Sequence, residues 1–321
     1  WREVVRSDSR TRLSLRQLPR SWARRISIGG GCYPLATMAT QPLRLTVGRP
    51  KQGPIGTIVE TGQSVIQRRR LLLYLTVAEV RNDGGNSLLG NLWLILDPAI
   101  QLAIYYFLVG AVLNRPQPAF ALFLFSAILP WRWLSMALSS AAVSVRKKDK
   151  VMRQIAFPHI VLPIASLSAS SLSFLFGLLP LCCLYLVYPD RLTPWILSFP
   201  LIAVVQILWM LPLAIFFSAL SVFFRDIGNL ITHALRIAFY LSPALFSYDR
   251  ILEVLEQRPP ARVLLDLNPM AWILTAYRDI FYEGRSADWG ALLGVALASI
   301  PFTLVSVYLF RRMAPSFPKV L

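Results

Sequence analysis

Apolar runs of nearly membrane-spanning length recur along this chain, and they restrict its fold more than any other feature. A helix needs roughly 20 apolar residues to cross the hydrocarbon core of a bilayer. Six runs approach that requirement, at residues 93–113, 119–145, 160–188, 195–224, 231–246 and 289–310. Hydrophobic residues make up 55% of the chain and charged residues 15%, whereas soluble domains carry about a quarter charged residues. The sequence therefore predicts an all-α polytopic membrane protein with six transmembrane helices.

Basic residues between the runs predict the orientation of the chain. They gather before the first run, between the second and third, and after the last, at Arg68, Arg69, Arg70, Arg81, the segment 146–163, Arg311, Arg312 and Lys319. By the positive-inside rule both termini are cytosolic and the segment 248–288 is external. Topology and anionic lipid also account for the net charge of +17, so nucleic acid is not expected as a partner.

The segment Arg146–Pro163, RKKDKVMRQIAFPHIVLP, is the most distinctive connection between two runs. It carries five basic residues and one acid, so it belongs in water or among lipid headgroups. The Phe157-Pro158 pair ends any helix just before the next run begins. A short basic helix, a proline break and a span would form a bent, knuckle-like connection that a cytosolic partner could bind. We call this segment the basic knuckle.

The residues before the first run divide into three parts. Residues 1–37 are rich in Arg and Ser and fit an organellar transit peptide, or an over-extended reading frame or disordered tail with the true start at Met38. Residues 39–62 are rich in Gly, Pro and Thr, so residues 1–63 are expected to be unstructured. Residues 64–85 predict an interfacial amphipathic helix, or alternatively a cytosolic extension of the first span. The transmembrane domain would then occupy residues 86–321.

Motifs for catalysis are absent from the sequence. There is no Gly-rich phosphate loop, GxSxG, HExxH or CxxC. The two histidines, His159 and His233, stand apart from any nucleophile or clustered ligand, and the three cysteines show no metal-binding spacing. We therefore expect no catalytic residue, no metal and no cofactor in this chain, and any energy source must come from elsewhere.

A polar stripe in the second run is the clearest functional signal inside a span, because ionisable groups at membrane depth are costly. It consists of Trp131, Arg132, Trp133, Ser135 and Ser139. Spacings of three and four place Arg132 and the serines on one helical face, where they could line a polar pathway with a tryptophan offered to a sugar ring. Alternatively, Arg132 pairs with Asp97 or with backbone carbonyls and locks the bundle. Arg236, in the fifth run, could snorkel to the cytosolic edge.

The external segment is too apolar for a plain loop. Two amphiphilic stretches, around residues 251–256 and 263–284, flank Arg258-Pro259-Pro260. The second stretch is too short to cross the membrane and long enough to enter and return. They predict two short re-entrant helices that close a channel, or alternatively an external lid without a gating role.

Six strings in order resemble the permease subunits of ABC-2 exporters, in particular those that move lipid-linked polysaccharides such as O-antigen, capsule, teichoic acid and galactan. The strings are SLLGNLWLILDP (87–98), LPWRW (129–133), IAFPHIVLP (155–163), FFRDI (223–227), YLSPALF (240–246) and NPMAWILTAYRDIFYEG (268–284). The resemblance implies an ABC-2 (type V exporter-like) fold in the bacterial cytoplasmic membrane. It also implies a channel made by two copies of this chain, driven by two copies of a separate cytosolic ATPase that binds ATP and Mg.

The same resemblance implies roles for particular residues. Coupling to the ATPase would fall on Lys147, Lys148, Asp149, Lys150, Arg153, Phe157 and Pro158. The substrate channel would include Tyr105, Tyr106, Trp131, Arg132, Trp133, Ser135 and Ser139, and the external gate Asn268, Pro269, Trp272, Tyr277 and Arg278. Arg132 would suit the anionic head of a lipid pyrophosphate, although the family does not lead us to expect an arginine there.

Two other functions remain open from the sequence. The same fold could export another amphiphile, such as a drug or a lipid. A membrane-embedded transferase would instead need paired acidic residues, or a His with an Asp, at one membrane face, and the sequence offers neither pattern.

Overall fold

The computed structural model describes residues 54–84, 90–108, 118–149, 157–246, 248, 251, 263 and 265–320. The chain divides into two units, Trp1–Arg44 and Leu45–Leu321, and all of the described residues belong to the second. The predictions for the tail and for Met38 therefore lie outside the described residues, apart from the part of the tail that begins at Pro54. Every regular element in the described ranges is helical.

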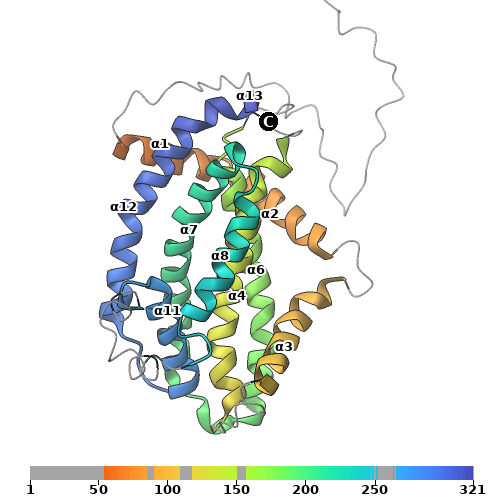
Figure 1. Cartoon of the computed structure of the whole chain (residues 1–321), viewed down its shortest axis with the longest axis vertical. Coiled ribbons are helices and arrows are strands. Elements are labelled where there is room, and N and C mark those ends of the chain that lie inside the picture. Colours follow the sequence, from red (N-terminus) through yellow and green to blue (C-terminus); the bar gives the residue numbers. More distant parts are fainter. Residues whose placement is uncertain are drawn as a thin grey trace, which may run out of the picture. The chain divides into compact units, whose positions relative to one another are not determined.

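Four long apolar helices form the body of this unit (Figure 1). They are α4 (Phe120–Lys147), α6 (Val161–Val187), α7 (Phe199–Phe223) and α12 (Trp289–Met313). A 3₁₀ turn, η6 (Pro194–Ser198), leads into α7. α4 packs on α6 and α7, and α7 packs on α12. Their bounds lie within a few residues of the spans predicted at 119–145, 160–188, 195–224 and 289–310, and each helix is long and apolar enough to cross a membrane.

Two shorter apolar helices lie beside α4. α3 (Trp93–Tyr105) follows the 3₁₀ turn η3 (Gly90–Leu92) and continues as a π turn to Leu108, so the last part of the predicted span 93–113 lies outside the described residues. α8 (Ile227–Leu241) has 15 residues and measures about 22 Å, short of the roughly 30 Å hydrocarbon core. The apolar helix predicted at 231–246 runs instead from Ile227 to Leu241, so its predicted bounds were wrong by four and five residues. Pro243 excludes its preceding residue, Ser242, from the helix, and Ser242 is extended.

The chain before α3 forms two helices, where the sequence predicted one. α1 (Pro54–Gln67) and α2 (Arg69–Gly84) meet at a turn at Arg68. The expected start of the helix at Ser64 was wrong, because the helix begins at a proline, which the first turn tolerates. α1 packs on α12, where Glu60 and Arg311 form an ion pair of 2.9 Å, and α2 packs on α6. These tertiary contacts stabilise a segment whose composition indicated a flexible lead.

Small side chains bring α4 and α6 close together. Ala165, Ala169, Ser173 and Gly177 follow one another every four residues along α6, and all are buried. A Cβ at Gly177 would lie 2.7 Å from Cδ1 of Leu129 on α4. Such small-residue stripes let backbones approach where lipid supplies no hydrophobic driving force between helices. α4 consequently becomes the most enclosed of the four long helices.

Polar side chains of α7 reinforce the packing against α4. Nε2 of the fully buried Gln206 donates to the carbonyl oxygen of Pro130 at 2.9 Å. The Ser221 hydroxyl donates to the carbonyl oxygen of Ala142. Pro130 has no N–H to donate within the helix, and Gln206 adds a tertiary hydrogen bond to α4 at this position.

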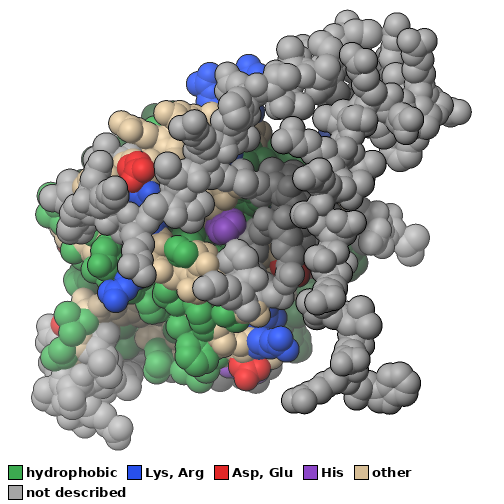
Figure 2. All heavy atoms as spheres, turned by 90° about the horizontal axis from the view of Figure 1, so that it is seen from above, with side chains coloured by type: hydrophobic (Ala, Val, Ile, Leu, Met, Phe, Trp, Pro, Cys, Tyr) green, Lys and Arg blue, Asp and Glu red, His purple; other side chains and the backbone are tan. Residues whose placement is uncertain are grey.

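Charged and aromatic residues close one end of the bundle, which we call the basic end. α1 and α13 (Phe317–Val320) lie at this end in Figure 1, and Figure 2 looks onto it, with Lys and Arg side chains around its edge. Phe317 is fully buried and its ring lies 5.4 Å from that of Phe310, 6.1 Å from Phe223 and 6.1 Å from the His159 imidazole. The C-terminal turn thus joins α12, α7 and the start of α6.

Candidate functional site

A polar groove lies between α3, α4 and α8, with a volume of about 430 Å³. Its polar lining residues are Gln101, Arg132, Ser135, Ser139, Thr232 and Arg236, and its aromatic lining residues are Tyr105, Trp131, Phe239 and Tyr240. An adjoining hollow shares Gln101, Tyr105 and Arg132 and adds Asp97. The exposed Ile104 of α3 lines the adjoining hollow.

Most of the polar stripe predicted from the sequence lines this groove. Arg132, Ser135 and Ser139 share one face of α4, as their spacing indicated, and Trp131 lies beside them. The ring of Phe239 on α8 lies 5.6 Å from those of Tyr105 and Trp131. These three rings form an aromatic wall next to the two arginines, and Tyr105 is the most accessible of the three, since Trp131 and Phe239 are each 5% exposed.

Two of the predicted channel residues lie elsewhere. Trp133 is 2% exposed and stacks on Phe174 of α6 at 4.2 Å, so it belongs to the core. Positions two apart on a helix point about 200° apart, and Trp131 and Trp133 therefore cannot both face the groove. Tyr106 is exposed, lies near Phe120 and is absent from the groove lining. Its neighbour Tyr105 lines the groove instead.

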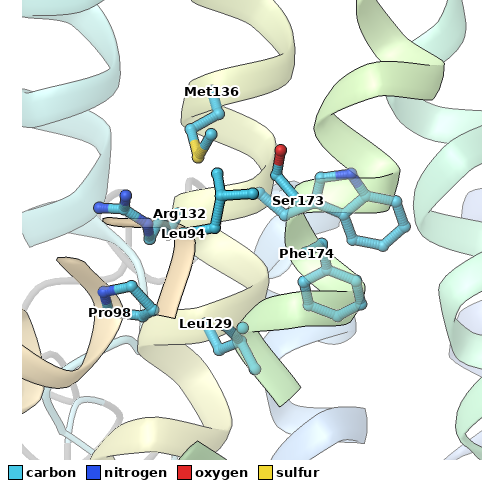
Figure 3. Close-up of a pocket in the computed structure, with 9 residues that line it drawn as sticks. Leu94, Pro98, Leu129, Arg132, Met136, Ser173 and Phe174 are labelled. Carbon is cyan, nitrogen blue, oxygen red and sulfur yellow. The ribbon is translucent and has the colours of Figure 1, made fainter. Parts of the chain in front are cut away.

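Arg132 lines the groove and is also paired with Asp97. The two alternatives given by the sequence, a polar pathway and an ion pair within the bundle, therefore each describe part of its environment. Nη2 of Arg132 lies 2.9 Å from Oδ2 of Asp97 on α3. The side chains are 24% and 44% exposed, respectively. In Figure 3 the guanidinium points away from Ser173 and Phe174 of α6. The small hollow drawn there has a volume of about 10 Å³, room for no more than about one water, so it is a packing gap.

The predicted gate residues lie in α11 (Pro269–Arg278) and its π-helical continuation η7 (Asp279–Glu283), at the end of the bundle opposite the basic end. Asn268 caps α11 by accepting from the Met270 amide at 3.0 Å, and its Nδ2 donates to Ser242 Oγ. Pro269 occupies the first turn. Nε1 of Trp272 donates to the carbonyl oxygen of Asp266 at 2.8 Å. This half of the predicted segment is a capped, tethered helix, while 252–256 lie outside the described residues.

Arg278 and Tyr277 are core residues of this segment. Arg278 is 4% exposed, and its two Nη atoms donate to the carbonyl oxygens of Phe246 and Ala244 at 3.0 and 3.2 Å. Its guanidinium lies 4.0 Å from the centre of the Phe123 ring. Burial lowers the pKa of Arg278 to about 10, which leaves it charged at neutral pH. Tyr277 is fully buried and stacks on Phe281 at 5.9 Å.

Further contacts tie η7 to neighbouring connections. Tyr282 donates to the carbonyl oxygen of Pro118, before α4, and Tyr185 of α6 donates to that of Phe281 at 2.7 Å. Arg191, in the 3₁₀ turn η5 (Pro189–Arg191), donates to the carbonyl oxygen of Tyr282 and lies over its ring at 4.9 Å. Burial raises the pKa of Asp279, and its ion pair with Arg285 opposes this shift. The segment therefore moves only if several of these contacts break.

The predicted coupling residues lie at the basic end, and only part of the knuckle is described. Lys147 is exposed at the end of α4, whereas Lys148 is paired with Glu79 of α2. Phe157 is 5% exposed and packs in an apolar cluster with α6, α7 and α12, so its side chain anchors the segment and is not offered to a partner. Pro158 and Asp149 are partly exposed, and Lys150 and Arg153 lie outside the described residues.

Glu79 is the residue at this end that the sequence reasoning missed. Besides Lys148, it accepts a hydrogen bond from the Ser166 hydroxyl of α6 at 2.9 Å. Its signal in the sequence was weak, since it is one acid in a stretch noted for its arginines. Among the described residues, no group of three or more His, Cys, Asp or Glu side chains could hold a metal ion.

A comparison with protein families identifies the chain. The family described as "ABC-2 type transporter" matches residues 70–282, more than half of the chain. The chain belongs to the ABC-2 type transporter family. The match runs from α2 through η7, and with the apolar helices it confirms the predicted all-helical membrane fold.

Similar proteins align over almost their whole length. The O-antigen export system permease protein RfbA of Myxococcus xanthus is 27% identical over 255 residues, covering 79% of this chain and 96% of the relative. A protein of the same name from Klebsiella pneumoniae is 26% identical over 254 residues, covering 78% and 95%.

Proposed function

We propose that this chain is the membrane-spanning permease subunit of an exporter for lipid-linked polysaccharide. The observation that carries the proposal is the polar groove along α4, with Arg132, Arg236 and an aromatic wall, in a chain similar to O-antigen export permeases along most of its length. A hydrophilic polymer needs a corridor in which its polar groups are not stranded in lipid. Aromatic faces accept successive sugar rings without tight binding at any one of them.

A separate ATPase subunit would drive transport from the basic end. Exposed Lys147 and the remainder of the knuckle are placed to contact it, while Phe157 and the Lys148–Glu79 pair hold the knuckle on the bundle. ATP and Mg would be bound by that subunit. A movement imposed on the knuckle would reach α4, which lines the groove, and α6, which packs on it.

A second copy of this chain would cover the groove. The flanking helices α3 and α8 are too short to span alone in the described residues and expose apolar side chains. With the basic end facing the cytosol, in accordance with the positive-inside rule, the α11 end would be external in a bacterial inner membrane. α11 and η7 would there act as the gate.

The test is ATP turnover by this chain reconstituted in lipid with the ATPase encoded beside it, with candidate lipid-linked glycans added in turn. Stimulation by one glycan class is the expected result and would identify the substrate. A complex that hydrolyses ATP but responds to no glycan would indicate a different amphiphile. If no ATPase associates with the chain, the proposal is wrong.

Two variants test the coupling role of the knuckle in the same assay. Lys147→Gln should weaken association with the ATPase, while Arg312→Gln, which removes an exposed charge from the same end on α12, should not. Equal losses in both variants would mean that the overall charge of this end matters and the knuckle itself does not.

A further inference from the structure

Two arginines line the polar groove, and only one of them has an acidic partner. Arg132 of α4 pairs with Asp97, whereas Arg236 of α8 contacts no acidic side chain among the residues that the structure describes. Asp97 is the only acid among the described lining residues of the groove and its adjoining hollow. The groove therefore carries an excess of positive charge.

Arg236 is too deep in its helix for its charge to be explained by a position at the helix end. It lies nine residues after Ile227, where α8 begins, and five residues before Leu241, where it ends, so it is about 14 Å and about 8 Å from the two ends along the helix axis. A charge at such a depth is costly unless it faces water or a partner of opposite sign. Arg236 is exposed towards the groove, so an anion in the groove would supply that partner.

The ion pair between Arg132 and Asp97 leaves most of the hydrogen-bond donors of Arg132 free for another acceptor. A single N–O contact of 2.9 Å joins the two side chains, although a guanidinium has five N–H donors in a fork. Among the described residues, Asp97 is the only acceptor that Arg132 meets. Asp97 is 44% exposed, so it can turn out to water when a better acceptor arrives.

We infer that the groove binds a phosphoryl group through Arg132 and Arg236, and that Asp97 occupies Arg132 until this anion displaces it. A phosphoryl group has several acceptor oxygens and up to two charges, so it can accept from both guanidinium forks at once. A carboxylate has one charge and two oxygens and offers less to two arginines. Tyr105 and Tyr240 are the accessible aromatic side chains of the groove, and they would contact whatever the phosphoryl group is attached to, whereas Trp131 and Phe239 are each only 5% exposed.

This inference rests on the proposed function for the source of the anion, which would be the diphosphate of a lipid-linked glycan. The site itself is defined by the two arginines. A soluble phosphate would be recognised by the same chemistry, and the experiment must separate these two sources.

The test is a binding titration with the full-length chain in phosphatidylcholine nanodiscs, followed by tryptophan fluorescence and repeated by calorimetry. The probes are a short isoprenyl diphosphate and inorganic pyrophosphate. Arg132→Gln and Arg236→Gln should each weaken binding of the isoprenyl diphosphate by about tenfold or more, because each removes charge-assisted hydrogen bonds. Asp97→Asn should strengthen binding by about three- to tenfold, because the internal competitor is removed.

The control is Arg312→Gln, which removes a cation outside the groove and should leave binding unchanged. A purely structural pair would give the opposite result for Asp97→Asn, a loss of both stability and binding. That outcome, or binding that survives both arginine substitutions, would overturn the inference.

The probes then identify the source. Preference for the isoprenyl diphosphate indicates a lipid-linked ligand, and equal affinity for inorganic pyrophosphate indicates a site for a soluble phosphate. Arginine-dependent binding in a chain that associates with no ATPase would leave the site standing while the proposed function fails. If the complex still exports glycan with both arginines replaced, the proposed function stands and the inferred phosphoryl site is wrong.

Discussion

Lys148, at the end of α4, donates a hydrogen bond from Nζ to Oε2 of Glu79 on α2, at 2.9 Å. The other oxygen of Glu79 accepts from the Ser166 hydroxyl on α6, also at 2.9 Å. One carboxylate therefore joins the helix before the first apolar run to both helices that flank the basic knuckle. Both charged side chains are less than a quarter exposed, so the pair is screened less than a surface ion pair.

Glu79→Gln should lower the free energy of unfolding by about 1–3 kcal/mol, because it leaves Lys148 partly buried without its counter-charge. Thermal denaturation of the purified chain measures this. The double variant Glu79→Gln, Lys148→Gln should recover part of the loss, since neither charge is then stranded. Strictly additive effects in this double-mutant cycle would show that the contact contributes nothing to stability.

Gly177→Ala should destabilise the bundle by about 1–3 kcal/mol through overpacking, because its Cβ would lie 2.7 Å from Cδ1 of Leu129. Leu129→Ala in the same chain should relieve part of this clash. Gly294→Ala on α12 is the matched control, since no atom lies within 4 Å of the position that a Cβ would take there. The measurement is the denaturation midpoint in detergent, and equal effects at the two glycines would contradict the close packing of α4 on α6.

Arg278→Lys should lose about 2–4 kcal/mol of stability although the charge is kept. A lysine cannot reach the carbonyl oxygens of Phe246 and Ala244 with a planar fork, nor stack as well on Phe123. Protease sensitivity of the segment between α8 and α11 should increase. Arg285→Lys is the comparison, since Arg285 is largely exposed; a similar loss there would mean that the buried fork is unimportant.

His159 should make the basic end sensitive to acid. Burial between Phe157 and Phe317 lowers the pKa of His159 below its ordinary value of 6.5. The unfolded chain therefore takes up the proton first, and stability is complete above about pH 6.5 and falls as the pH drops below it. Denaturation midpoints measured from about pH 7.5 to about pH 5.5 should decline less in His159→Gln than in the parent chain. The same substitution at the exposed His233 should leave the decline as it is; identical slopes in all three proteins would exclude His159 as the cause.

The long spans could be predicted from the sequence because crossing a bilayer is a local property. The transfer free energy of about 20 consecutive side chains decides it, and the bounds of α4, α6, α7 and α12 agree with the predictions within a few residues. The face of α4 that carries Arg132, Ser135 and Ser139 was also predictable, because helical periodicity is local. The same periodicity could have excluded Trp133, whose direction is opposite to that of Trp131.

The environments of the site residues depended on contacts between residues far apart in the chain, and so they could not be predicted from the sequence. Of the two readings of Arg132, neither could be chosen from the sequence, because Asp97 lies 35 positions away on another helix. Helix packing likewise determines that Phe157 and Arg278 are buried and that α1 begins at Pro54. Hydropathy and charge thus determined that this chain crosses a membrane and where its long helices lie. Only the tertiary structure decided which side chains line the groove and which of them are paired. Packing brings together residues that are far apart in the sequence, and no short stretch of sequence contains that information.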